Sequence, residues 1–242
     1  MDTFRAFSLT HAAVVVCFAA TVTALVAARR RLHSAAARRF DVTLAWVTLA
    51  IFLFTNGRPL MPDGFRLDWS LPLHVCDLVT LFVPLALRFD WRPMRALVYF
   101  WGIGLCTQGF ITPDLQDGPA KVGFWSFWLA HVAVVGAALY DVAARGYRPN
   151  WRDYRTALVA SFLYVAVILP LDVVLHVNYG YIGPSTPGQP SLVDVLGPWP
   201  WRVPIILALA IAVMTLLMLP WWIMRPSAFT SGASAVARGG TT

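Results

Sequence analysis

Long apolar segments, separated by short polar stretches, account for most of this chain. Each segment is close to the roughly 20 residues that an α-helix needs to cross the hydrocarbon core of a bilayer. Proline, glycine and tryptophan gather between the segments, which is typical of turns and of interfacial aromatic belts. The segments run over residues 8–28, 41–56, 71–88, 96–112, 123–144, 155–177 and 203–224. The pattern therefore predicts an all-α membrane protein, a polytopic bundle of about seven transmembrane helices.

The composition agrees with lipid as the main solvent. Of the 242 residues, 58% are hydrophobic and 13% are charged, and the mean hydropathy is +0.64. Soluble domains carry about 45–50% apolar and about 25% charged residues. We expect a single seven-helix transmembrane domain over residues 1–225 and a disordered tail over 226–242, which is rich in Ser, Ala, Gly and Thr. The sequence does not indicate the oligomeric state.

The net charge of +7 predicts an orientation rather than a nucleic-acid partner, because it is divided unevenly between alternating loops. One set of loops holds fourteen of the nineteen Lys and Arg residues, and the other set holds five. The positive-inside rule then places the N-terminus outside and the C-terminus in the cytoplasm, which requires an odd number of spans. Arg29, Arg30 and Arg31 directly follow the first segment, so we expect an anchor there and not a cleaved signal peptide.

Several predicted spans carry polar or ionisable side chains, which cost about 2.5–3.5 kcal/mol each at the middle of a membrane helix. When the predicted orientation is imposed, these residues fall in the outer halves of four different spans. The set predicts a polar cavity near the outer leaflet, open to the outer face or to lipid. Its members are His74, Cys76 and Asp77 in the third span, Gln108 in the fourth with Asp114 after it, His131 in the fifth, and Asp172, His176, Asn178 and Tyr179 at the end of the sixth.

Cysteine and histidine together can perform acyl chemistry. A thiolate attacks the acyl carbon, and the histidine that took its proton then protonates the leaving group. Cys76 is the candidate nucleophile, and His131 is the candidate base because its neighbours along the span are apolar. His74 is only two residues from Cys76, about 200° around a helix, and the two would not share a face. His74 is therefore expected to have a supporting role, as are Asp77, Asp114 and Tyr179.

Several of these residues can also serve other purposes. Gln108 or Asn178 can donate hydrogen bonds to the oxyanion of a tetrahedral intermediate, but Gln108 can equally join two helices. A free cysteine usually behaves as a small buried hydrophobe, and Asp172 and His176, four residues apart, can satisfy one another. We expect neither a metal nor another cofactor, because no HExxH-type ligand pair is present. The metal alternative would use His74, His131, His176, Asp77 and Asp172.

Two main classes of function fit such a cavity. One is an enzyme that transfers or hydrolyses the acyl chain of a membrane lipid. The other is a transporter or a non-catalytic membrane protein that binds a lipid or a small molecule, although the repeats and paired helix interruptions typical of transporters are not visible. A structural subunit of a complex is a third possibility, which would leave the shared depth of the polar residues unexplained. In every case the expected partner is membrane lipid.

The polar residues belong to motifs that follow one another in a fixed order between about residues 70 and 201. They are Leu71-Pro72-Leu73-His74-Val75-Cys76-Asp77-Leu78, Tyr99-Phe100-Trp101-Gly102, Thr112-Pro113-Asp114-Leu115, Gly146-Tyr147-Arg148-Pro149, Asn178-Tyr179 and the stretch 190–201. In these blocks the chain resembles the YwaF-like family of bacterial integral membrane proteins, which implies a bacterial plasma-membrane location.

The same resemblance extends to an animal family of transmembrane phospholipid acyltransferases, in which a cysteine is implicated in moving fatty acyl chains between glycerophospholipids. Cys76 matches the cysteine of the first motif, and His131 matches the histidine of the fifth span. The resemblance thus implies a cysteine-dependent acyltransferase, by analogy of site rather than by derivation from the residues.

Overall fold

The computed structural model describes residues 3–184 and 192–223, and the regular structure in this part of the chain is helical apart from one isolated bridge between Thr3 and Asp117. The tail predicted over 226–242 lies outside the described residues. The α-helices are α1 (Leu9–Arg30), α2 (Ser34–Gly57), α3 (Val75–Phe89), α4 (Arg92–Leu97), α5 (Gln108–Ile111), α6 (Val122–Ala143), α7 (Trp151–Leu175) and α8 (Arg202–Ile223). A π-helical segment, Val98–Ile103, continues α4, and 3-10 turns occupy Arg58–Leu60, Pro62–Gly64, Tyr179–Tyr181 and Leu192–Leu196.

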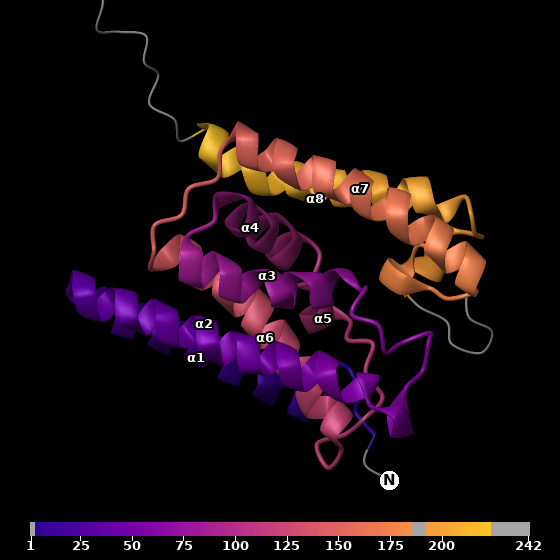
Figure 1. The fold of residues 1–242 in the computed structure, drawn as a ribbon, viewed down its shortest axis with the longest axis horizontal. Helices are drawn as coiled ribbons and strands as arrows, with labels where there is room; N and C mark the ends of the chain where they lie inside the picture. The colour runs from indigo at the N-terminus through magenta and orange to yellow at the C-terminus, as the bar shows by residue number, and fades with distance from the viewer. Residues whose placement is uncertain (1–2, 185–191, 224–242) are drawn as a thin grey trace, which may run out of the picture.

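The helices form three groups that lie side by side (Figure 1). α3, α4 and α5 lie in the middle, α1, α2 and α6 lie on one side, and α7 and α8 pair on the other. α3 packs against α2 and α6, while α4 packs against α7. α3 and α6 both begin at the same end of the bundle, which we call the site end; α1 and α8 also begin there.

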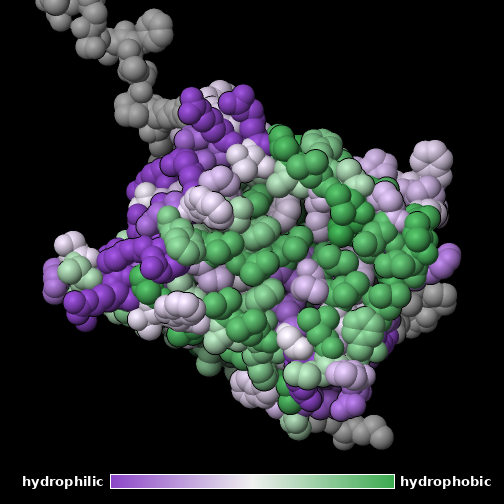
Figure 2. Space-filling model, viewed as in Figure 1, coloured by the Kyte–Doolittle hydropathy of each residue, from purple (hydrophilic) through white to green (hydrophobic). Residues whose placement is uncertain are grey.

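Five helices are long and apolar enough to cross a membrane, namely α1, α2 with the turn up to Leu60, α6, α7 and α8. Their outward faces carry large apolar side chains, such as Val16 (67% exposed), Leu163 (61%) and Leu216 (62%). Figure 2 shows a hydrophobic band across the middle of the molecule, with hydrophilic residues concentrated toward its ends. Contiguous apolar surface of this extent indicates contact with lipid. The protein is thus an all-helical membrane protein, as the hydrophobic pattern predicts.

The third and fourth predicted spans are less regular than simple crossing helices. α3 covers 15 residues and begins at Val75 instead of residue 71, because the preceding segment is extended and held by another loop. In the fourth predicted span, the helix that starts at Arg92 gives way to a turn over residues 105–107 before the single turn of α5. Both segments lie inside the bundle, where irregular backbone is tolerated because neighbouring protein shields it from lipid.

Buried ion pairs hold the opposite end of the bundle, which we call the arginine end. Asp41 and Asp141 are 3% and 4% exposed, so each needs a charged partner to offset the cost of leaving water. Arg145, next to the end of α6, reaches both of them, at 3.5 and 3.0 Å. The pairs join the ends of several helices and are Arg29–Asp41, Arg92–Asp153, Arg95–Asp141, Arg145–Asp41, Arg145–Asp90 and Arg145–Asp141. The arginines that predict the orientation therefore also fasten helices together.

A hydrophobic core lies between the two ends. Val79 and Val83 of α3 pack in one cluster with Phe100 of the π-helical segment, Val134 of α6 and Met214 of α8, and all five are completely buried. Gly102 allows the π-helical segment to approach α6, because a Cβ there would lie 3.3 Å from the Val134 side chain. This core sets the positions of α3 and α6 relative to each other, and so the positions of the residues at the site end.

Asp141→Asn should destabilise the protein, because it leaves Arg95 and Arg145 without a charge they both contact. Removing one partner of a buried ion pair costs about 3 kcal/mol, so we expect a thermal unfolding midpoint several degrees lower in detergent. Asp117→Asn is the matched control, since its pair with Lys121 is exposed and should be worth less than about 1 kcal/mol. Equal midpoints for the two variants would show that the arginine end does not depend on this cluster.

Candidate functional site

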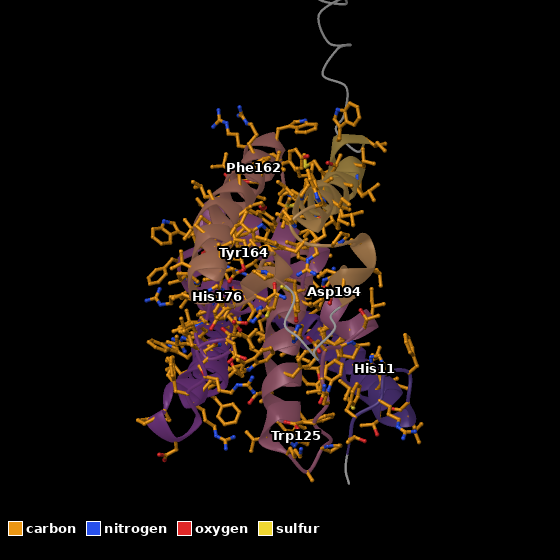
Figure 3. All side chains as sticks on the ribbon, turned by 90° about the vertical axis from the view of Figure 1, so that its right-hand side faces the viewer. His11, Trp125, Phe162, Tyr164, His176 and Asp194 are labelled. Carbon is orange, nitrogen blue, oxygen red and sulfur yellow. The ribbon has the colours of Figure 1, made fainter. Side chains whose placement is uncertain are left out.

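Two loops at the site end are tied together by Tyr179, a completely buried residue in the turn after α7. Its hydroxyl donates a hydrogen bond to the carbonyl of Leu67 at 2.6 Å and accepts one from the N–H of Leu71 at 3.1 Å. Tyr164 of α7 adds a bond from its hydroxyl to the carbonyl of Leu73, at 2.8 Å. Figure 3 looks onto this end, with Tyr164 near the middle of the view. These bonds position the segment that leads into α3.

The turn after α7 is stabilised by contacts with α7 and with the start of α8. The buried carboxylate of Asp172 accepts a hydrogen bond from the N–H of Tyr179 at 2.9 Å. Gly180 has a φ of +63°, and a Cβ there would lie 2.3 Å from the hydroxyl of Tyr164, so glycine is required. Arg202, at the start of α8, donates to the carbonyl of Gly183 at 2.7 Å. The turn is therefore fixed in position where Tyr179 and Gly180 contact His74.

Cys76 lies in the first turn of α3, two residues after the N-cap His74. The residue is intermediate in exposure, and its thiol donates a hydrogen bond to Oδ1 of Asp77, 3.9 Å from Sγ. The other oxygen of Asp77 accepts a bond from the backbone N–H of His74 at 3.2 Å, which caps the helix. The positive end of a helix stabilises a thiolate. Cys76 therefore lies beside the positive end of α3.

His74 is an extended residue just before α3, so the helical angle between His74 and Cys76 that argued against their cooperation does not apply. Its ring is enclosed by Trp69, Tyr179 and Tyr181, with centroids 5.4, 5.1 and 5.6 Å away. Nδ1 accepts a hydrogen bond from the N–H of Gly180 at 3.2 Å. In neutral imidazole the proton must then be on Nε2. That Nε2 is buried and has no hydrogen-bond partner among the described residues.

His131 has the opposite arrangement. It lies in the middle of α6, stacked on Phe127 with a centroid distance of 4.2 Å. Nδ1 is 2.8 Å from the carbonyl of Phe127, which can only accept, so Nδ1 carries the proton. Nε2 then has a free lone pair and faces Gly109 of α5, where a Cβ would lie 2.4 Å from it. The ring is thus set as a proton acceptor, and Gly109 leaves the space that it occupies.

Cys76 and His131 come from helices that begin at the same end and pack against each other. Each lies one turn before a completely buried valine of the common core, Val79 on α3 and Val134 on α6. No hydrogen bond joins the sulfur of Cys76 to either ring nitrogen of His131 in the described structure. The packing of α3 on α6 thus relates the two candidate residues, and no direct bond does so among the described residues.

The predicted supporting residues lie around this end but differ in their exposure and in their hydrogen-bond partners. Gln108 is exposed and donates to the hydroxyl of Thr112 at 2.8 Å. The side-chain oxygen of Asn178 accepts a bond from the N–H of Gly183 at 2.9 Å. Asp114 is exposed and accepts a bond from the hydroxyl of Tyr181 at 3.2 Å. Gln108 and Asn178 are thus already committed to local partners.

The expected pairing of Asp172 with His176 is wrong. α7 ends at Leu175, and His176 follows in the left-handed conformation with a φ of +54°, which turns its side chain to the exposed surface. Asp172 binds the backbone of Tyr179 instead. Within residues 3–184 and 192–223, no three His, Cys, Asp or Glu side chains come together in a way that could hold a metal ion.

Several aromatic residues that shape this site were not predicted from the sequence. Tyr181 packs on His74, and burial raises the pKa of its hydroxyl, which the nearby Asp114, Cys76 and Asp77 raise further. It therefore stays protonated and can donate to Asp114 over a wide pH range. Tyr164 gives a signal in the sequence, because it lies in a predicted span and a buried hydroxyl needs a hydrogen-bond partner. That partner is the carbonyl of Leu73, in the segment before α3.

Comparison with known proteins places the chain in a family. A model of the TMEM164 family matches residues 4–218, which include α1 to most of α8 and every candidate site residue. No curated protein and no solved structure matches the chain. The chain therefore belongs to the TMEM164 family, and its several long apolar helices make it a multi-pass membrane protein.

Gly109→Ala should displace the imidazole of His131, because the added methyl would lie 2.3 Å from Cδ2 of the ring. Forcing a group into a packed interior typically costs about 1–3 kcal/mol, which thermal unfolding in detergent would detect. In a His131→Ala background the same change should cost much less. Gly57→Ala is the control, since a Cβ there meets nothing within 4 Å. A cost that is the same with and without the imidazole would disprove the contact.

Proposed function

We propose that this protein is a membrane-embedded lipid acyltransferase or acyl hydrolase, with Cys76 as nucleophile and His131 as base. One observation carries the proposal. Cys76 lies in the first turn of α3, two residues after the buried His74, whose hydrogen bond leaves a ring donor, and α3 packs against α6, where the hydrogen bond of the buried His131 leaves a ring acceptor. A merely structural set of polar residues would satisfy itself, whereas Nε2 of His74 is buried and has no hydrogen-bond partner among the described residues.

The reaction would proceed in two steps. Nε2 of His131 takes the thiol proton, Sγ of Cys76 bonds to the acyl carbon, and the carbonyl electron pair moves onto oxygen. Collapse of this intermediate breaks the ester bond, and the imidazolium protonates the departing lipid hydroxyl. In the second step a lysolipid hydroxyl, or water, gives its proton to His131 and attacks the thioester, which releases Cys76. A lysolipid acceptor makes the protein a transferase, and water makes it a hydrolase.

The substrate would reach the site within the membrane. In the proposed topology the chain crosses seven times with the site end outside, so the arginine end faces the cytoplasm as the positive-inside rule requires. Five crossings are the long apolar helices, and the other two are α3 and the interrupted segment from α4 to α5, both inside the bundle. The resemblance to the YwaF-like proteins favours a bacterial plasma membrane, and the site would then take phospholipids from its outer leaflet.

The topology predicts which introduced cysteines are labelled in intact cells. With Cys17, Cys76 and Cys106 replaced by alanine, Met61→Cys at the site end should react with a membrane-impermeant maleimide. Arg31→Cys at the arginine end should react only after the cells are permeabilised. Both positions are exposed, so accessibility on the protein itself is matched. The reverse pattern would invert the topology and move the site to the cytoplasmic leaflet.

The acyl chemistry is tested by lipid mass spectrometry on membranes that contain equal amounts of wild type, Cys76→Ala or His131→Ala. The membranes receive a phospholipid with an isotope-labelled acyl chain and an unlabelled lysophospholipid. We expect label to move to the lysolipid, or to free acid, with wild type only. Cys76→Ala should reduce the rate to background, and His131→Ala should reduce it by roughly 10²–10⁴, the usual contribution of a general base.

Cys17→Ala is the matched control, because this cysteine is exposed on α1 and should leave the rate unchanged. Equal label transfer by wild type and Cys76→Ala would exclude the proposed nucleophile. Labelled phospholipid that stays bound to the protein, with no label transferred to lysolipid or released as free acid, would instead favour a cavity that binds or transports lipid.

A further inference from the structure

The N-terminus of α3 holds two backbone N–H donors that have no backbone acceptor among the described residues. The N–H groups of Asp77 and Leu78 both donate to the carbonyl of His74, at 3.0 and 3.1 Å. The N–H groups of Val75 and Cys76 have no backbone acceptor within the described ranges, as expected for the first positions of a helix. Unpaired N–H groups at a helix start form a natural binding site for negative charge.

A second, independent donor lies beside them. His74 is 9% exposed, and its Nδ1 is engaged by Gly180, so the proton on Nε2 is buried and unmatched in the described structure. A buried donor without an acceptor is destabilising. Tyr179 and Tyr181 enclose the ring, and the first turn of α3, with Cys76 in it, follows His74 directly. Such a donor is explained if an oxygen from a ligand accepts its hydrogen bond.

We propose that Nε2–H of His74 and the backbone N–H groups of Val75 and Cys76 form the oxyanion site for acyl transfer. This rests on the proposed function and assigns the part of it that stabilises the transition state. When Sγ of Cys76 bonds to the acyl carbon, the carbonyl oxygen becomes negative and lies close to the backbone of the same residue. The N–H of the nucleophilic residue is thus placed to donate to it, as happens at other nucleophiles that use their own amide.

The carboxamides of Gln108 and Asn178 suit this role less well. The amide of Gln108 already donates to Thr112 and is exposed, so water would have to reorganise around it during the reaction. Asn178 stands in the turn after α7, where its oxygen accepts from Gly183, and not on the helix that carries the nucleophile. The donors at the start of α3 are fixed by the helix and by the loop of Tyr179, and preorganised donors contribute most to the rate.

The test compares two reactions of Cys76 in the purified full-length protein, each followed by intact-protein mass spectrometry. Acylation by a p-nitrophenyl fatty ester passes through an oxyanion, whereas alkylation by a fatty iodoacetamide does not. His74→Phe keeps a ring but removes the donor, and it should slow acylation by about 10²–10³, the usual loss for one oxyanion donor. Alkylation should change by less than about twofold, and His74→Gln, which retains an N–H donor, should recover part of the acylation rate.

The control variant is His176→Phe, which replaces an exposed histidine on the same end and should affect neither reaction. Acylation of His74→Phe at the wild-type rate would overturn the oxyanion site and leave the proposed function intact. An equal loss in both reactions would also overturn it, because His74 would then only support the position of Cys76. A wild-type Cys76 that is alkylated but never acylated would overturn the proposed function and the oxyanion site together.

Discussion

The two hydrogen bonds of the Tyr179 hydroxyl fix the start of α3, and the site depends on them. They join the loop before α3 to the turn after α7, segments more than a hundred residues apart in the chain. Because Tyr179 is completely buried, both bonds form in surroundings where unpaired polar groups are costly. Asp172 holds the backbone of the same residue, so the turn cannot easily move away. His74, Cys76 and their neighbours therefore occupy fixed positions before any substrate arrives.

That rigidity gives the two histidines different chemistry. Among the residues that the structure describes, neither ring has an ionised partner, and one backbone group engages each of them. A backbone N–H engages Nδ1 of His74 and leaves a donor, whereas a backbone carbonyl engages Nδ1 of His131 and leaves an acceptor. Side chains of one type thereby differ in what their other ring nitrogen offers, a hydrogen-bond donor in His74 and an acceptor in His131. The distinction depends on hydrogen-bond partners that come from other loops or from the preceding turn.

The arginine end shows how a membrane protein can use charge for two purposes. Its arginines agree with a cytoplasmic position, yet several are paired with aspartates, among them Asp41 and Asp141, that lie almost completely out of water. Between lipid-facing helices there is little hydrophobic driving force for association, so packing and polar contacts have to fasten the bundle. The paired charges at one end and the Tyr179 loops at the other close the bundle around the apolar core of α3, α4 and α6.

The sequence alone determined the solvent and the class of fold, because hydrophobic segments of membrane length are a local property that tertiary contacts do not change. It also predicted that His74, Cys76, Asp77 and His131 would gather near one end, since alternating helices bring outer halves together. Only the tertiary structure decided that α3 begins after His74, that Asp172 serves Tyr179 and not His176, and which nitrogen of each histidine is free. These features arise from contacts between residues that are distant in the chain or from the exact residue at which a helix stops, and neither leaves a periodic signal in the sequence.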